Sequence, residues 1–205
     1  MKNELEIRKI LINNTIRLIA EGGFEKATTH AITFSGPLTP DVNMNEVYIY
    51  RLFGGKENLY EAAFNYLDKE ILFALHNCID PFADLERSTR KKLYDIYIRV
   101  WRFVLNNELY FRCYIRYYYS IYFKDTSLKT HTKLFESIVL EFSPLFEKGV
   151  DAKLIMHSVY IAMLDFAVRV YNGDLQDTPT NVEHIFNILY SMMMAYFKDT
   201  RKQSK

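Results

Sequence analysis

Apolar residues recur in this sequence at the spacing of one helix face, with charged residues between them, in most segments free of glycine and proline. The first such segment carries Ile7, Ile10, Leu11 and Leu18 in this register. The sequence contains no run in which apolar and polar residues alternate as they do in a half-buried strand. The pattern therefore predicts an all-α protein, with an N-terminal three-helix unit followed by a helical bundle.

Residues that stop helices divide this pattern into about nine segments. Paired glycines end the first and third predicted helices, at Gly22-Gly23 and Gly54-Gly55. The breaker-rich residues 35–43 predict a loop, Asp80-Pro81 predicts a turn, and Ser143-Pro144 predicts a kink or a split. The predicted helices are 3–21, a short segment after Thr28-Thr29, 45–52, 56–78, 84–106, 107–123, 127–147, 151–172 and 180–198.

The expected organisation is asymmetric. Residues 1–55 predict a small helix-turn-helix domain, and residues 56–205 predict a larger helical domain for ligand binding and dimerisation. The long helix that opens at Lys56 connects the two. Because the chain has 205 residues, of which 49% are apolar, it can bury a sizeable core.

The segment from Asn45 to Tyr60 carries the most specific chemistry in the chain. It predicts a short helix that Asn45 can cap, a two-glycine break and the start of a long helix, with a phenol, an arginine and a lysine around the break. An exposed short helix of this kind can enter the major groove of DNA while neighbouring groups hold phosphates. Lys56 is expected beside the free amides of a helix start, where an anion binds well.

The stretch from Tyr48 to Leu59, Tyr-Ile-Tyr-Arg-Leu-Phe-Gly-Gly-Lys-Glu-Asn-Leu, resembles the signature of the tetracycline-repressor-like (TetR) family of transcriptional regulators. The stretch from Glu21 to Thr29 resembles the same family, and the resemblance covers about residues 5–65. It implies a homodimer that binds a palindromic operator in double-stranded DNA, usually as a repressor. It also implies a variable helical domain that binds an unknown small-molecule effector.

The resemblance assigns roles to individual residues. Tyr50 matches the tyrosine whose hydroxyl reaches a backbone phosphate, and Lys56 matches the lysine that contacts phosphate from the fourth helix. The front of the third helix matches the positions that contact bases. The DNA-contacting residues implied in this way are Thr29, Asn45, Glu46, Tyr48, Tyr50, Arg51 and Lys56.

The sequence also departs from the family pattern. Additional residues fall within 35–43, and Glu46 stands where lysine is frequent, although a carboxylate there can accept a hydrogen bond from cytosine N4. Seven basic and seven acidic residues among the first 60 leave this module near neutral. These features support an alternative, a regulator-derived protein that has lost specific DNA binding and acts through protein partners. A small helical enzyme is a further alternative.

The larger half is rich in aromatic residues, and tyrosines crowd the segment 107–123. One interpretation is a pocket for a flat or greasy small molecule, with phenols as hydrogen-bond donors and with Arg112, Arg116 and Arg169 as candidate anion partners. The alternative is an aromatic core with additional surface tyrosines. The residues predicted to contact the ligand are Tyr97, Trp101, Tyr114, Tyr118, Met163 and Phe166.

The last two predicted helices are strongly apolar. This composition fits a four-helix bundle between two subunits, which the resemblance also implies, or packing within one subunit.

The sequence contains no catalytic motif, no phosphate-binding glycine loop and no pair of histidines at metal-ligand spacing. It therefore predicts no enzyme activity, no metal and no cofactor. Cys78 and Cys113 lie in apolar segments and are expected as reduced thiols. Neither a signal peptide nor an uncharged apolar run of membrane-spanning length is found, so we expect a cytoplasmic protein.

Overall fold

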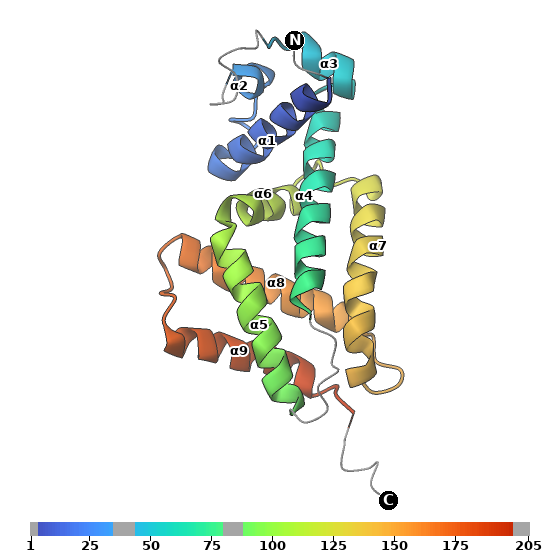
Figure 1. Ribbon diagram of the computed structural model, residues 1–205, viewed down its shortest axis with the longest axis vertical. Helices are drawn as coiled ribbons and strands as arrows, with labels where there is room; N and C mark the ends of the chain where they lie inside the picture. The colour runs from blue at the N-terminus through green and yellow to red at the C-terminus, as the bar shows by residue number, and fades with distance from the viewer. Residues whose placement is uncertain (1–3, 35–43, 80–87, 199–205) are drawn as a thin grey trace, which may run out of the picture. The chain divides into compact units, whose positions relative to one another are not determined.

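A computed structural model describes residues 4–34, 44–79 and 88–198 of the chain. The loop predicted at 35–43 and the turn predicted at Asp80-Pro81 lie outside these residues. The described residues form nine α-helices and one short 3₁₀-helix and contain no strand, as the sequence predicts (Figure 1). The helices are α1 (Glu4–Gly22), α2 (Thr29–Phe34), α3 (Val47–Phe53), α4 (Lys56–Cys78), α5 (Thr89–Asn106), α6 (Glu108–Tyr118), α7 (Asp125–Phe142), η1 (Ser143–Leu145), α8 (Ala152–Tyr171) and α9 (Pro179–Met194).

Helix ends follow the breakers in the sequence. Gly23 adopts a left-handed φ of 76° after α1, and its N–H donates to the carbonyl of Ile19 at 2.9 Å. The split predicted at Ser143-Pro144 is confirmed, because η1 replaces the α-helix there. α9 begins at Pro179, a favoured first helical position, and the Thr178 hydroxyl caps it.

The predicted helix 107–123 is too long at its carboxyl end. α6 stops at Tyr118. Beyond it, the Ser120 hydroxyl donates to the carbonyl of Tyr117 at 2.7 Å and accepts from the N–H of Tyr122 at 3.1 Å. Such local bonds from a serine side chain compete with the helical pattern and favour a turn.

The described residues divide into two compact units. Unit 1 comprises the residues up to 71 together with 107–132, and unit 2 comprises 72–106 together with the residues from 133 onward. Residues of α4 and of α7 therefore belong to both units. The functional division between residues 55 and 56 stays a prediction.

Within unit 1, α1 packs against α2 and α6. Leu11 and Ile19 of α1 are fully buried. The Tyr60 hydroxyl donates to the carbonyl of Ala27 at 2.6 Å, and Arg116 Nη1 donates to the carbonyl of Ile19 at 2.8 Å. These bonds fix the end of α1 and the connection to α2 against α4 and α6.

Within unit 2, α5, α8 and α9 pack against one another. Among the described helices, α8 is long and apolar enough to cross a membrane by length and composition. Its Met156, Met163 and Leu164 are buried in unit 2, whereas Leu154 is 64% exposed, so packing in the core accounts for part of this apolar character.

Candidate nucleic-acid interface and apolar cavity

α3 turns one side into unit 1 and the other to solvent. Ile49 is fully buried, whereas Val47 is 66% exposed and Tyr50 is 60% exposed. Asn45 Oδ1 accepts a hydrogen bond of 3.1 Å from the N–H of Val47, the first residue of α3. The N-cap position itself is Glu46, whose side chain makes no cap hydrogen bond, so the cap predicted at Asn45 lies one residue too early. One apolar anchor thus holds the helix while the opposite side stays open to a partner.

The carboxyl end of α3 is fixed by contacts from α1 and α4. Gly54 takes a left-handed φ of 76°, and its N–H donates to the carbonyl of Tyr50 at 2.9 Å. Arg8 Nη1 donates to the carbonyl of Leu52 at 2.5 Å, and its guanidinium lies 4.3 Å from the centre of the Phe53 ring. These contacts satisfy carbonyls that a helix end leaves without intrahelical partners.

The amino end of α3 is joined to α2. Thr29 Oγ1 donates a hydrogen bond of 2.6 Å to Oε2 of Glu46, directly before α3. Both residues were predicted as DNA contacts, and the structure places them against each other. The hydroxyl hydrogen of Thr29 is used in this bond.

Arg51 is exposed, and its charge is already engaged. Its Nη2 lies 3.2 Å from Glu4 Oε1, and its guanidinium lies 4.8 Å from the centre of the Tyr48 ring. Both side chains of the ion pair are more than half exposed, so it contributes little to stability and can open for a phosphate or a base.

Lys56 is the first residue of α4 and is half-buried. Its Nζ lies 5.8 Å from the centre of the Tyr60 ring. Burial, with smaller contributions from Tyr122 and Glu57, raises the pKa of the Tyr60 hydroxyl to about 12, so this ring stays neutral beside the lysine. Lys56 therefore combines a cation with the start of a 23-residue helix.

Six of the seven predicted DNA contacts lie between Asn45 and Lys56, and the seventh, Thr29, reaches this segment through Glu46. The surface they form carries both signs of charge. A nucleic-acid surface needs cations that can reach phosphates. Lys56 is one candidate, and Arg51 becomes a second when its ion pair with Glu4 opens.

Unit 2 contains an apolar cavity of about 110 Å³. Residues of α4, α5, α7, α8 and α9 line it. Tyr97 supplies a hydroxyl, but this group donates to the carbonyl of Val182 at 3.0 Å, and burial raises its pKa above the ordinary value. The lining residues are Leu75, Ile79, Leu93, Ile96, Tyr97, Val100, Phe135, Ile138, Phe142, Met156, Val159, Tyr160, Met163, Phe186, Leu189 and Met193.

No protein-family model and no curated protein matches the chain. Solved structures do match it. A TetR family transcription regulator from Marinobacter aquaeolei VT8 is 18% identical with a TM-score of 0.65, covering 90% of this chain and 94% of that chain. A putative TetR family transcription regulator from Shewanella sp. PV-4 is 12% identical with a TM-score of 0.71, covering 97% and 100%. The multidrug binding protein EbrR, complexed with imidazole, is 14% identical with a TM-score of 0.63, covering 95% and 97%.

The protein has the TetR fold. The likeness extends over at least 90% of this chain in each of these three matches, well beyond the residues that carry the sequence resemblance.

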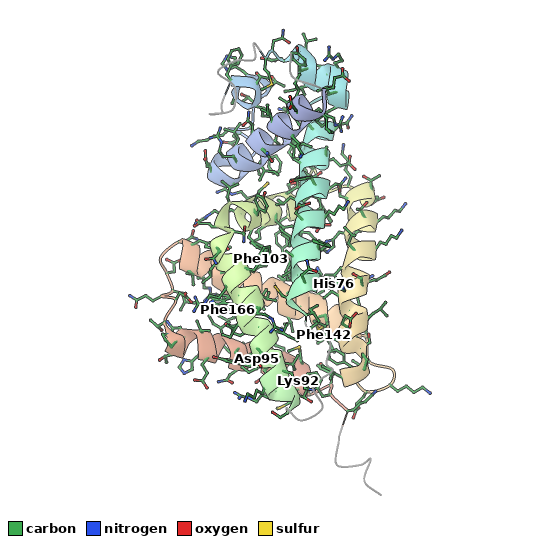
Figure 2. All side chains as sticks on the ribbon, in the orientation of Figure 1. His76, Lys92, Asp95, Phe103, Phe142 and Phe166 are labelled. Atoms are coloured by element: carbon green, nitrogen blue, oxygen red, sulfur yellow. The ribbon has the colours of Figure 1, made fainter. Side chains whose placement is uncertain are left out.

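Within this TetR fold, only part of the predicted ligand set lines the cavity. Tyr97 and Met163 do, whereas Phe166 does not. Figure 2 labels Phe166 on α8 and Phe142 on α7, and of these two only Phe142 lines the cavity. Tyr114 and Tyr118 belong to unit 1, where both rings lie near His131. The three arginines proposed as anion partners also lie elsewhere than in the lining. Periodicity identified apolar faces in the sequence but not which faces meet.

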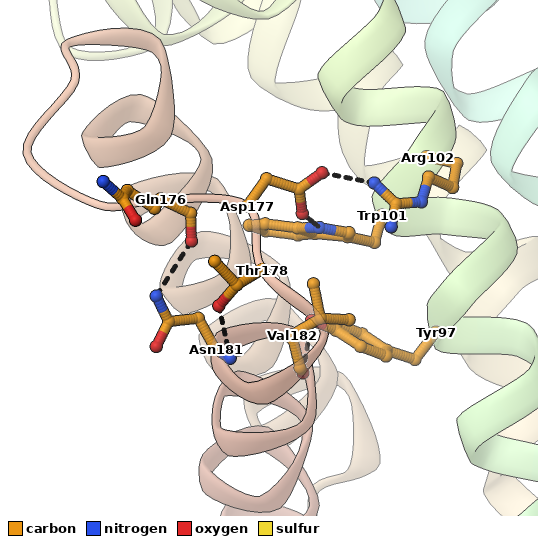
Figure 3. Close-up of polar contacts among 8 residues, drawn as sticks. All are labelled: Tyr97, Trp101, Arg102, Gln176, Asp177, Thr178, Asn181 and Val182. Carbon is orange, nitrogen blue, oxygen red and sulfur yellow. Dashed lines mark hydrogen bonds and ion pairs between the residues drawn. The ribbon is translucent and has the colours of Figure 1, made fainter.

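Trp101 has a structural role next to the cavity. Its indole Nε1–H donates to Asp177 Oδ1 at 3.0 Å, and Arg102 binds the other oxygen of the same carboxylate (Figure 3). Asp177 lies in the connection between α8 and α9, so these bonds fix that connection to α5. The sequence contained one signal for this role, the single tryptophan itself, because a buried indole N–H usually needs a hydrogen-bond acceptor.

The structure places no metal site among the residues it describes, since no three His, Cys, Asp or Glu side chains gather there.

Proposed function

We propose that the protein is a cytoplasmic transcriptional regulator that binds a palindromic operator in double-stranded DNA as a homodimer and acts as a repressor. The observation that carries this proposal is the exposed α3. It is anchored by Ile49, it is followed by Lys56 at the start of α4, and it stands in a chain with the TetR fold.

Two residues would hold the phosphates. Tyr50 presents a 60% exposed phenol whose hydroxyl can donate to a phosphate oxygen. Lys56 would place its ammonium beside the first amides of α4, where the helix dipole also favours an anion. Asn45, Tyr48 and Arg51 would face the base edges or the flanking phosphates.

A mobility-shift titration on the DNA upstream of the protein's own gene tests the proposal. Lys56→Ala removes one phosphate contact, so binding should weaken for all sequences alike and the slope of log affinity against log salt should fall by about one. Lys153→Ala is the matched control, because Lys153 is a partly exposed lysine of unit 2 paired with Glu136 at 3.1 Å. An unchanged slope for Lys56→Ala would remove this lysine from the interface.

We also infer that a small molecule modulates operator binding from the cavity of unit 2. The described residues of its lining include no charged side chain, so the effector expected is uncharged and largely apolar. A cavity of about 110 Å³ is near the size that holds a benzene-sized guest, and a larger effector would have to widen it. A similar structure, the multidrug binding protein EbrR, holds imidazole.

The cavity also gives a route for regulation. Leu75 of α4 lines it, and α4 begins at Lys56. An effector that prefers one position of Leu75 would shift the population of α4 conformations and thereby lower the affinity for DNA. Benzene serves as the probe, and its binding in the cavity should raise the thermal unfolding temperature of the wild-type protein. Val159→Phe should fill the cavity and abolish this stabilisation. Val168→Phe, on the same helix but outside the lining, should leave it intact.

An alternative function is supported by the charge balance at α3. The ion pair of Arg51 with Glu4 and the exposed side chains of Val47 and Tyr50 would suit a protein partner as well. The titration above separates the two functions, because only the loss of specific DNA binding predicts no shift at low salt.

A further inference from the structure

Glu46 stands directly before α3, between the exposed residues Asn45 and Val47. Its carboxylate is held by Thr29 through the hydrogen bond of 2.6 Å between Oγ1 and Oε2. A charge-assisted bond of this length fixes the orientation of the carboxylate. The bond uses one of its two oxygens, so Oε1 remains as an oriented acceptor.

Among the residues that the structure describes, the nearby cations do not occupy this acceptor. Arg51 lies against Glu4 and the Tyr48 ring, and Lys56 lies over the Tyr60 ring. Glu46 is half-buried at a position that faces bases if the proposed function holds. A half-buried carboxylate oxygen in such a position stays open to a donor, and the edge of a base can supply one.

A carboxylate distinguishes the four bases in the major groove. Cytosine presents the N4 amino donor, and guanine and thymine present acceptors that repel an anion. Adenine presents the N6 donor next to the N7 acceptor, so a carboxylate accepts from it less favourably. The expected order of preference is cytosine, then adenine, then guanine or thymine.

We propose that Glu46 selects cytosine in each half-site of the operator and that Thr29 holds its carboxylate in the reading orientation. This inference rests on the proposed DNA-binding function. Thr29 is then a positioning residue rather than a phosphate contact. A phosphate oxygen only accepts hydrogen bonds, and the single hydroxyl hydrogen of Thr29 already goes to Glu46.

The first experiment identifies the preferred sites. The full-length protein is incubated with double-stranded DNA randomised over about two helical turns, because the two half-sites of a dimer lie about one turn apart. Bound molecules are sequenced, and affinities are measured for the best site and for its single base-pair variants. The expected result is one cytosine per half-site whose replacement lowers affinity by roughly 5- to 150-fold.

Glu46→Gln tests the assignment to Glu46. Glutamine keeps an oxygen for Thr29 but can bind adenine at N6 and N7, so the preference should move from cytosine to adenine at that position alone. Glu57→Gln is the matched control, because Glu57 is an exposed acid in the first turn of α4, paired with Lys124 at 3.3 Å. It removes the same charge and should change affinity without changing base preference.

Thr29→Val tests the positioning. Valine keeps the shape of threonine but lacks the hydroxyl, so cytosine should stay preferred while its advantage over the other bases shrinks several-fold. Thr29→Ser should restore the discrimination. Thermal unfolding of each variant reports separately on stability, which a bond that merely joins α2 to α3 would also affect.

The outcomes separate the two claims. Sequence-specific binding whose base preference is the same in Glu46→Gln would overturn the role of Glu46 and leave the regulator proposal standing. Loss of stability in Thr29→Val with unchanged discrimination would overturn the role of Thr29. If the wild-type protein binds no DNA at low salt, the regulator proposal and this inference fall together.

Discussion

Asp68 on α4 and His131 on α7 meet inside unit 1, with side-chain exposures of 0% and 3%. His131 Nδ1 lies 2.9 Å from Asp68 Oδ1. The rings of Tyr114 and Tyr118 stand 6.2 Å and 5.8 Å from the imidazole. An isolated polar group in such an interior is costly, so each partner depends on the other for its stability.

This dependence predicts strong coupling in a double-mutant cycle. Asp68→Ala or His131→Ala alone leaves a buried group without its main partner and should lower the free energy of unfolding by roughly 3–5 kcal/mol. The double variant should lose less than the sum of the two, by about 1–3 kcal/mol. Urea unfolding measures all three, and the exposed pair Arg17–Glu21 serves as the control, expected to couple by only about 0.3–0.5 kcal/mol. Additive losses at Asp68 and His131 would contradict the dependence.

Cys113 makes a prediction about alkaline pH. Burial raises the pKa of its thiol from the ordinary 9.0 to about 12, with Arg116 opposing the shift. The unfolded thiol ionises near pH 9 while the folded thiol stays neutral to about pH 12, so its stabilising contribution is complete below pH 9 and is lost as pH rises toward 12. The stability difference between wild type and Cys113→Ala should therefore shrink above pH 9 by about 1.4 kcal/mol per pH unit, measured by urea unfolding. A difference that is constant with pH would contradict the shift.

Tyr114 and Tyr118, which lie near His131, show what the sequence could not predict. Tyr114 and Tyr118 were predicted to contact a ligand because tyrosines crowd that segment, yet they surround a buried histidine in unit 1. Their helical period identifies which face of α6 is apolar. It carries no information on which helix meets that face, because the partner His131 comes from another element.

At the scale of elements, α3 is a seven-residue helix that depends on its flanks for its shape. Its end is closed by Gly54, where an added Cβ would lie 3.3 Å from Nδ2 of Asn58. That amide nitrogen in turn donates to the carbonyl of Phe53 at 2.9 Å. The geometry of α3 is thus tied to one glycine.

Gly54→Ala should therefore affect both stability and DNA binding. A side chain at a φ of 76° costs about 1–2 kcal/mol, and the displaced Asn58 amide should loosen the end of α3. Gly173→Ala is the control, because it has a φ of 80° with no atom within 4 Å of the added Cβ. Urea unfolding should show similar losses for both variants, whereas mobility-shift titration should show weaker binding only for Gly54→Ala. Equal DNA binding in both would argue against a role for this helix end.

Most helix positions could be predicted because breakers and caps are local signals. Asn45, Gly54 and Pro179 each act on residues within one turn. The end of α6 was missed because a serine side chain, rather than a glycine or a proline, stops it. The cavity was predicted only in part, because five helices far apart in sequence contribute to it.

At the scale of the whole molecule, the proposed binding to a palindromic operator would require two copies of α3. The last two helices are the predicted contact between copies. α8 and α9 pack against each other in unit 2, yet Leu154 of α8 is 64% exposed and Ile188 and Met194 of α9 are 49% and 54% exposed. Large apolar side chains left open on adjacent helices are typical of a surface that a second subunit covers.

Ile188→Asp tests this contact, because a carboxylate buried between two subunits would lack a partner. Sedimentation should show a dimer for wild type and a monomer for the variant at the same concentration. Operator affinity should fall by roughly 100-fold or more, since each half-site is then bound independently. Leu140→Asp, at a 70% exposed position on α7, should leave both properties unchanged. A dimer that survives Ile188→Asp would place the subunit contact elsewhere. A wild-type protein that is monomeric and still binds a palindrome tightly would show that DNA binding does not require a dimer.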